Sequence, residues 1–207
     1  MGIYILVAKK YVGRRSEELK KGTKILLAIL VLAVVLVVYT FSTYNSLVRL
    51  QENVNSKWSQ VENQLQRRAD LIPNLVNTVK GYAKHEKEIF ETLAQARSKL
   101  LNSSTVEDKA KANDELSSAI SRLLMIVENY PNLKADRTFV QLMDELSGTE
   151  NRIAVARKDY NEAVKQYNMK IKVFPNVLIA RMFEFEERQY FQASSQAKSV
   201  PSVDFSK

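Results

Sequence analysis

The chain contains one histidine, His85, and the residues around it decide whether it could belong to a metal site. His85 is followed by Glu86, but the second histidine that an HExxH zinc motif requires is replaced by Ile89. A di-iron carboxylate bundle places a glutamate three residues before each histidine, and that position holds Tyr82. We therefore interpret His85 as a surface or capping residue.

Two adjacent arginines could bind an anionic partner. The planar guanidinium groups of Arg67 and Arg68 match a phosphate or a carboxylate. The alternative is structural: Arg67 pairs with Asp70 within one helix, and a cross-helix ion pair forms, for instance with Glu150. We favour the structural interpretation and keep both arginines as candidate interface residues.

Two asparagines beside tyrosines form the next polar pattern. Asn161 follows Tyr160 and, seven residues later, Asn168 follows Tyr167. This spacing predicts a buried polar layer that fixes the register of packed helices. Binding of a ligand by the same four residues is the alternative.

The remaining candidates for catalysis are equally weak. Glu184, Glu186 and Glu187 lie on one predicted short helix, where carboxylates do not face each other across a hydrolytic cleft. The chain has no cysteine and no GxxxxGK(S/T), GxGxxG or GxSxG motif, so thiol, nucleotide and serine-hydrolase chemistry have no residues to rest on. We predict no catalytic residue, metal or cofactor, and a protein that is not an enzyme.

An apolar run at residues 25–41 is long enough to cross a membrane. It carries no charge and, with its flanks, reaches the roughly 20 residues that span about 30 Å of hydrocarbon. We predict a retained transmembrane helix over residues 25–43. A cleaved signal peptide is the alternative, but no small-x-small cleavage pattern precedes Tyr44. The candidate anchor residues are Ile25, Leu30, Val35 and Tyr39.

Residues 1–24 form a basic tail with seven lysines and arginines against two glutamates. The positive-inside rule places such a tail in the cytoplasm and the soluble part of the chain on the other side of the bacterial plasma (inner) membrane. The tail could instead bind anionic lipid or nucleic acid. A nucleic-acid partner is disfavoured, because the positive charge sits beside a membrane segment.

Apolar residues at helical spacing predict an all-α protein, with an antiparallel bundle of about four long helices in residues 44–191. We expect a first helix over residues 44–101, kinked around residues 69–72 by Pro73 and weakened again at Gly81.

Capping patterns then place the other helices. Thr105 with Asp108 resembles a capping box that opens a second helix. A third helix starts near Asp136 and keeps coiled-coil spacing up to the break at Phe174 and Pro175. A short fourth helix reaches about residue 191, and residues 192–207 are expected to be disordered.

The predicted helix lengths leave part of the first helix without a partner. The second helix is less than half as long as the first, so the apolar stripe nearest the membrane would be partly bare and form an interface. Alternatively the kink folds the helix back, or the fourth helix and the tail cover the stripe. The stripe consists of Leu47, Leu50, Val54 and Trp58.

The order of these residues resembles the LemA family of bacterial membrane-anchored helical proteins. The resemblance is carried by WSQVENQLQRRADLIPNLVNTVKGYAKHE at residues 58–86, YNSLV at 44–48, ENYP at 128–131, TENRIA at 149–154 and the two YN pairs, and it covers roughly residues 40–192. It implies a helical fold and an N-terminal anchor.

These observations favour a membrane-anchored interaction or scaffold protein of the bacterial cell envelope. Its expected partners are the lipid bilayer and either another protein or a second copy of the chain, and no small-molecule substrate is expected. Binding of anionic lipid or nucleic acid through the basic tail is the alternative. A membrane-associated enzyme is a further alternative, which would require a polar pocket with convergent ionisable groups.

Overall fold

The computed structural model describes residues 2–192, with side chains from residue 23 onward, and is helical without a strand in that part of the chain. The all-α prediction is confirmed. Most of the predicted C-terminal tail and the side chains of residues 1–22 of the basic tail lie outside the described residues. The helices are α1 (Gly2–Lys80), α2 (Lys87–Asn102), α3 (Val106–Val127), α4 (Pro131–Lys134), α5 (Arg137–Lys172) and α6 (Asn176–Met182).

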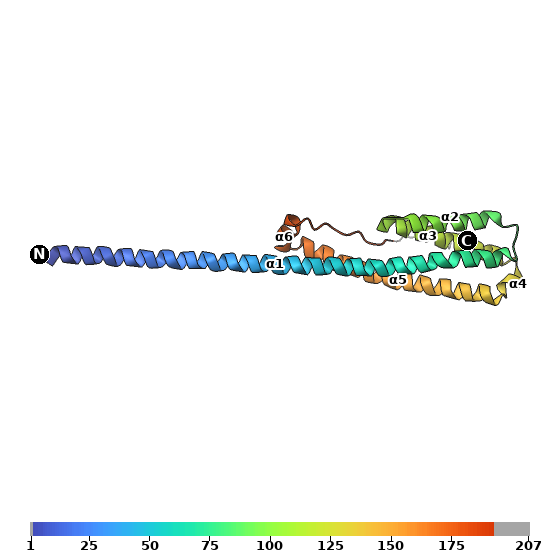
Figure 1. The fold of residues 1–207 in the computed structure, drawn as a ribbon, viewed down its shortest axis with the longest axis horizontal. Coiled ribbons are helices and arrows are strands. Elements are labelled where there is room, and N and C mark those ends of the chain that lie inside the picture. The colour runs from blue at the N-terminus through green and yellow to red at the C-terminus, as the bar shows by residue number, and fades with distance from the viewer. Residues whose placement is uncertain (1, 193–207) are drawn as a thin grey trace, which may run out of the picture.

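Helix α1 continues without a break from the apolar run into the bundle (Figure 1). Leu30 and Val35 are more than half exposed, and none of the apolar window is covered by the rest of the described chain. By length and composition, α1 is the one helix among the described residues that could cross a membrane. The apolar N-terminal helix therefore supports membrane anchoring, and the basic tail begins the same helix instead of forming a separate segment.

The other helices are arranged along the second half of α1 (Figure 1). Helix α5 lies beside α1 and is its most extensive partner, while α2 and α3 form a hairpin beside the end of α1 that is distant from the apolar run. Helix α6 lies at the opposite end of the bundle, next to the point where α1 leaves the apolar run. The distal half of the bundle thus contains the four long helices α1, α2, α3 and α5 together with the short α4, and the proximal half contains α1, α5 and α6.

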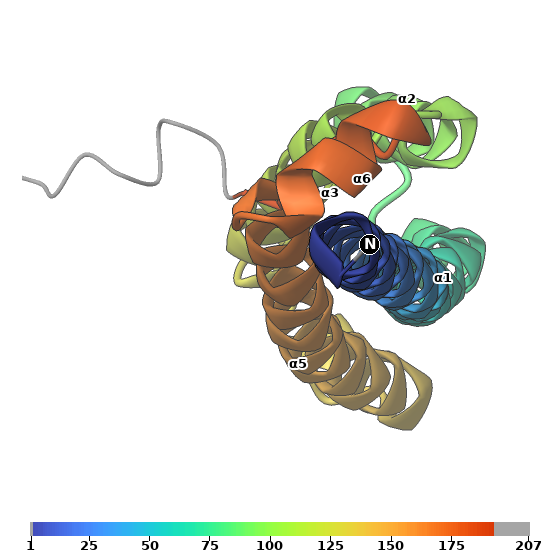
Figure 2. The same ribbon diagram turned by 90° about the vertical axis from the view of Figure 1, so that its left-hand side faces the viewer.

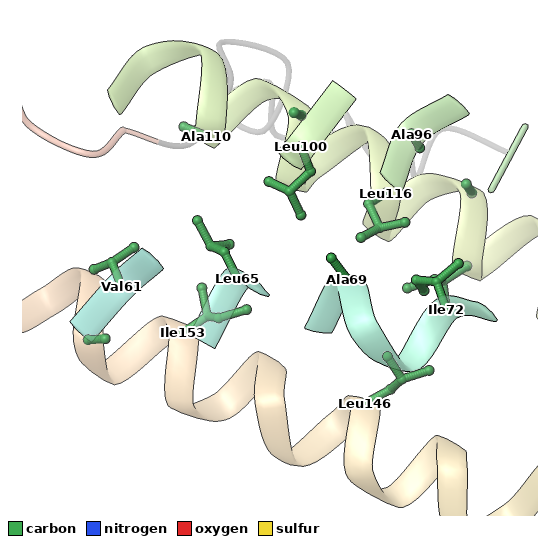
Figure 3. Close-up of a cluster of buried hydrophobic side chains, with 14 of the residues drawn as sticks. Val61, Leu65, Ala69, Ile72, Ala96, Leu100, Ala110, Leu116, Leu146 and Ile153 are labelled. Atoms are coloured by element: carbon green, nitrogen blue, oxygen red, sulfur yellow. The ribbon is translucent and has the colours of Figure 1, made fainter. Parts of the chain in front are cut away.

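The apolar stripes of these four helices meet in one core (Figure 3). Leu65 of α1 lies between Leu100 of the hairpin and Ile153 of α5. Ile72, two turns further on, lies between Leu116 and Leu146, and all six side chains are almost completely buried. Because the stripe of α1 has a period near 3.6 residues, it presents a continuous apolar surface to the helices on both sides.

The break in the predicted first helix occurs at Gly81, not at Pro73. Helix α1 ends at Lys80, and tight turns in which the Gly81 and Tyr82 amides donate to Thr78 and Val79 lead to α2. The predicted single helix over residues 44–101 is therefore wrong. Glycine has low helix propensity, and the chain reverses where that weakness coincides with the end of the bundle.

Helix α1 passes through Pro73 because another helix satisfies the group that proline leaves unpaired. Proline has no backbone N–H, so the Ala69 carbonyl four residues earlier has no helical partner. The Nε atom of Arg97 on α2 donates to that carbonyl at 2.9 Å. The hydrogen bond keeps α1 intact and also ties α2 to one position along it.

The predicted cap at Thr105 and the predicted helix start near Asp136 are both confirmed. The side chain of Thr105 accepts from the Asp108 amide at the start of α3, and Asp136 accepts from the Phe139 amide at the start of α5. Both bonds satisfy N–H groups that have no partner inside their helix.

The predicted fourth helix is shorter than expected, because α6 ends at Met182. Glu184 adopts a left-handed φ of 56°, and the Phe185 amide donates to the Ala180 carbonyl at 2.9 Å. This is the geometry of a Schellman motif, which ends a helix and turns the chain away from its axis. Residues 183–192 then continue without helical structure and are called the C-terminal segment below.

The Arg97 hydrogen bond predicts a specific non-additivity. We expect Arg97→Met, which keeps the apolar stem, to lower the free energy of unfolding by about 1–2 kcal/mol, because a buried carbonyl loses its donor. In a Pro73→Ala background the backbone amide that the substitution introduces can satisfy the Ala69 carbonyl, so the same change should cost about 0.5–1 kcal/mol less. Urea unfolding of the four detergent-solubilised proteins, followed by circular dichroism, measures both values. Equal costs in the two backgrounds would contradict this role of Arg97.

Candidate functional site

The apolar stripe nearest the membrane is covered inside the chain. Leu47 and Val54 are 0% and 2% exposed, and Leu50 and Trp58 are half-buried against the core. The expectation of a bare stripe is therefore wrong, and of the alternatives only cover by the C-terminal part of the chain agrees with the structure. Helix α5, α6 and the C-terminal segment pack where the hairpin does not reach.

Two asparagines of α5 hold the C-terminal segment by its backbone. The side-chain amide of Asn168 donates to the Arg188 carbonyl and accepts from the Arg188 amide, both at 2.9 Å. Asn161 makes the same pair of contacts with Phe191, at 3.0 and 2.9 Å. Because residues 161 and 168 lie two turns apart on one face of α5, their amides hold an extended chain along the helix.

Aromatic rings fill the space between these two amide contacts and α1. The Trp58 ring lies 5.1 Å from the Tyr160 ring and 6.2 Å from the Phe191 ring, measured between centroids. The guanidinium carbon of Arg157 lies over the Phe191 ring, 5.7 Å from its centroid. Trp58 is thus a contact between α1, α5 and the C-terminal segment.

The Tyr160 hydroxyl adds a further backbone contact, because it donates to the Gln189 carbonyl at 2.8 Å. Burial raises the pKa of Tyr160, with a smaller opposing effect from the positive charge of Arg188. The hydroxyl therefore stays protonated at neutral pH and remains a hydrogen-bond donor.

The site between α1 and α5 binds an extended peptide, and the occupant is this chain itself. The prediction of a polar layer identified Asn161 and Asn168 correctly but assigned them the wrong partner, because they bind the backbone of the C-terminal segment and not a facing helix. Because these contacts involve only backbone atoms of residues 188 and 191, the side chains at those positions do not indicate them. The seven-residue YN repeat was the only signal of the site in the sequence.

Arg68 is a buried structural residue. It is 5% exposed, pairs with Glu150 of α5 and donates to Asn113 of α3 at 2.9 Å. Burial lowers the pKa of Arg68, and the nearby carboxylates of Glu150 and Asp114 partly offset this effect. The predicted cross-helix pair with Glu150 is confirmed, and these contacts hold the Arg68 side chain inside the bundle.

The predicted pair of Arg67 with Asp70 is not formed. Asp70 accepts a hydrogen bond from Gln66 at 2.9 Å and lies 3.9 Å from Arg97, while Arg67 is exposed. Position 67 points away from the bundle, so its guanidinium remains accessible to solvent.

The other candidates for chemistry are dispersed. His85 is exposed in the turn after α1, and the described residues contain no group of three or more histidines or carboxylates that could hold a metal ion. Glu184, Glu186 and Glu187 lie on the C-terminal segment instead of a short helix, and Glu187 pairs with Lys172 at 2.7 Å.

A polar groove of about 770 Å³ lies on the α2–α3 hairpin. Its walls carry both signs of charge, and Lys99 pairs with Glu115 across the two helices. The residues that line it include Gln95, Lys99, Lys111, Glu115, Ser118 and Arg122.

Removing one asparagine side chain should release the C-terminal segment locally. We expect Asn168→Ala to increase hydrogen exchange at the Arg188 amide by about tenfold, because two hydrogen bonds of about 0.5–1.5 kcal/mol each are lost while packing around Phe191 remains. Hydrogen–deuterium exchange with mass spectrometry measures the change. Gln166→Ala, an exposed position on the same helix, is the control and should leave exchange unchanged. Unchanged protection in Asn168→Ala would mean that packing alone holds the segment.

The chain is similar in sequence to several known proteins. The chain is 30% identical over 217 residues to the magnetosome protein MamQ 1 of Paramagnetospirillum magneticum, a match that covers 90% of this chain and 79% of the relative. It is 28% identical over 215 residues to the magnetosome protein MamQ of Magnetospirillum gryphiswaldense, with the same coverage. Protein LemA of Metamycoplasma hominis is 29% identical over 155 residues, covering 72% of this chain and 69% of the relative.

The family model that describes the LemA family matches residues 57–205, which include α1 from Lys57 onward and all of α2 to α6. The matched region thus contains the helices that form the core and the asparagines that hold the C-terminal segment. The chain belongs to the LemA family.

Proposed function

We propose that the chain is a non-catalytic scaffold of the bacterial cell envelope. In this proposal α1 crosses the inner membrane with its N-terminus in the cytoplasm, and the bundle outside the cytoplasm contacts a protein partner. The observation that carries the proposal is the continuity of α1 from the apolar run to the distal end of the bundle. The relatives' names describe magnetosome proteins and a LemA protein, and none of them describes a reaction.

A continuous helix without a flexible joint holds its two ends at a fixed distance from each other. From residue 44 to Lys80 an α-helix rises by about 55 Å, so the distal end of α1 is held at that distance from the end of the apolar run. Helix α5 packs along this length, which stiffens it further. The α2–α3 hairpin is thereby presented far from the bilayer in a defined orientation.

Charge supports the orientation. Seven basic residues precede the apolar run, whereas Arg49 and Lys57 are the first two to follow it. The positive-inside rule retains the more basic flank in the cytoplasm.

The outer groove of the hairpin is the surface we assign to the partner. The stripe that could have been an interface is occupied by the chain itself, and Arg68 is buried. The groove combines a volume of about 770 Å³ with amide, hydroxyl and charged groups, which suits a polar polypeptide surface.

The orientation can be measured in the native cysteine-free chain. We expect Ser104→Cys, exposed in the turn between α2 and α3, to react with a membrane-impermeant thiol reagent in intact spheroplasts. Ser104 is a better position than Ser103, whose hydroxyl donates to the Lys99 carbonyl. Ser16→Cys in the basic tail is the matched control and should react only after lysis. The reverse pattern would place the bundle in the cytoplasm and overturn the proposed topology.

The partner surface can be tested by photo-crosslinking in intact cells. A photoreactive amino acid at Gln95, in the groove, should give one discrete adduct, and the same group at exposed Lys158 on α5 should not. Lys111→Glu should lower the yield by about fivefold, as expected for about 1 kcal/mol from a charge at the rim of an interface.

Two differently tagged copies show whether the adduct contains a second copy of the chain or another protein. The control Lys158→Glu should leave the yield unchanged. Equal adducts from both positions, or none from Gln95, would contradict the assignment of the groove.

A further inference from the structure

Helix α6 and the flanking residues Val173, Phe174 and Phe183 carry apolar side chains on more than one side of the helix. Ile179 and Ala180 face the bundle and are almost completely buried, whereas Phe174, Leu178 and Met182 are 75%, 57% and 69% exposed. Val173 and Phe183 are also about half exposed. Large apolar side chains on the open side of a helix are favoured by an apolar environment there, because their exposure to water is costly.

The position of α6 along α1 identifies that environment. The hydroxyl of Tyr39, inside the apolar run, donates to Asn176 in the first turn of α6 at 2.7 Å. About 20 residues are needed to cross the hydrocarbon, and counted from Lys24 they end near Tyr44. The Tyr44 ring lies 4.9 Å from the Phe183 ring just after α6. Both ends of α6 therefore contact the part of α1 where the bilayer ends.

The direction of α6 also suits a membrane surface. In the view along the long axis from the N-terminal side, α6 lies across the near end of the bundle, while α1 is seen end-on (Figure 2). If α1 crosses the bilayer, α6 is thus oriented along the membrane plane.

Basic side chains near α6 also suit contact with a lipid surface. Arg181 is the one charged residue of α6, and Lys170 lies in the last turn of α5. Positive side chains beside an apolar face interact favourably with lipid phosphates. The acidic residues Glu184, Glu186 and Glu187 follow at the start of the C-terminal segment, and Glu187 pairs with Lys172, also in the last turn of α5, at 2.7 Å.

We propose that α6 is an interfacial helix that rests in the headgroup region of the bilayer crossed by α1. Phe174, Leu178 and Met182 enter the boundary of the acyl chains, and the Tyr39–Asn176 hydrogen bond links the two membrane contacts. The bundle then meets the membrane at two points, which fixes its tilt. This inference rests on anchoring by α1 and is independent of the orientation and of the partner surface proposed above.

Tryptophan fluorescence with brominated lipid tests the inference on the full chain. The native tryptophan is first removed by Trp58→Phe, and Leu178→Trp or, as the control, Val140→Trp is then introduced. Both positions are exposed, at 57% and 44%, so a larger side chain has room at each. The proteins are placed in phosphatidylethanolamine and phosphatidylglycerol vesicles with or without bromine near the carbonyl end of the acyl chains.

We expect the emission of Leu178→Trp to be blue-shifted and to fall by about half with brominated lipid, as for a side chain buried about 5–10 Å into the interface. Val140→Trp, in the first turn of α5 at the distal end, should emit as in water and be unaffected. Water-like, unquenched emission from Leu178→Trp would overturn the proposal.

A blue shift without quenching that grows with the protein-to-lipid ratio would show that a second copy covers α6, and would also overturn it. If Trp58→Phe loses helical circular dichroism, the same comparison uses an environment-sensitive label on Leu178→Cys and Val140→Cys in the otherwise cysteine-free chain.

Discussion

The apolar stripe of α1 must be covered along the whole bundle, and this constraint decides the arrangement of the other elements. An uncovered stripe would expose several large side chains to water, at about 25 cal/mol for each Å² of apolar surface. Helix α5 covers one flank of α1, but the hairpin covers the other flank only in the distal half. Helix α6 and the C-terminal segment complete the cover, so that Leu47 and Val54 are as buried as the distal core.

Polar groups that would otherwise be unpaired determine where each element packs. The Ala69 carbonyl, freed by Pro73, is bound by Arg97 of α2, and the backbone at Arg188 is bound by Asn168 of α5. Arg68 meets Asn113 and Glu150 inside the bundle. Apolar packing tolerates small shifts along a helix, whereas a buried donor or acceptor without its partner costs about 1–3 kcal/mol. These contacts therefore specify one register among several that the core would accept.

The same arrangement limits where other molecules can bind. The groove between α1 and α5 contains the C-terminal segment, and the seam residues are shared among helices of the same chain. Two of the outward surfaces that remain lie at opposite ends of the molecule: the hairpin at the distal end and α6 beside the apolar run. The continuous α1 keeps these two surfaces at a fixed separation, as the proposed scaffold role requires.

The sequence by itself determined the local structure of this protein. The uncharged run at residues 25–41, the period of the apolar stripes and the caps at Thr105 and Asp136 each depend on neighbouring residues, so they could be predicted without the fold. The ion pair of Arg68 with Glu150 was also predicted, because two stripes that pack together place the groups beside them within reach.

Only the tertiary structure decided how long elements end and what covers them. Pro73 is normally a reason to expect a kink, and its effect depends on Arg97, which lies 28 residues after the Ala69 carbonyl that it binds. The path of the C-terminal segment depends on the left-handed turn at Glu184 and on asparagines that bind backbone atoms. Such contacts join residues far apart in the chain and place little demand on the identity of the bound residue, which is why the sequence pattern alone left the stripe of α1 uncovered.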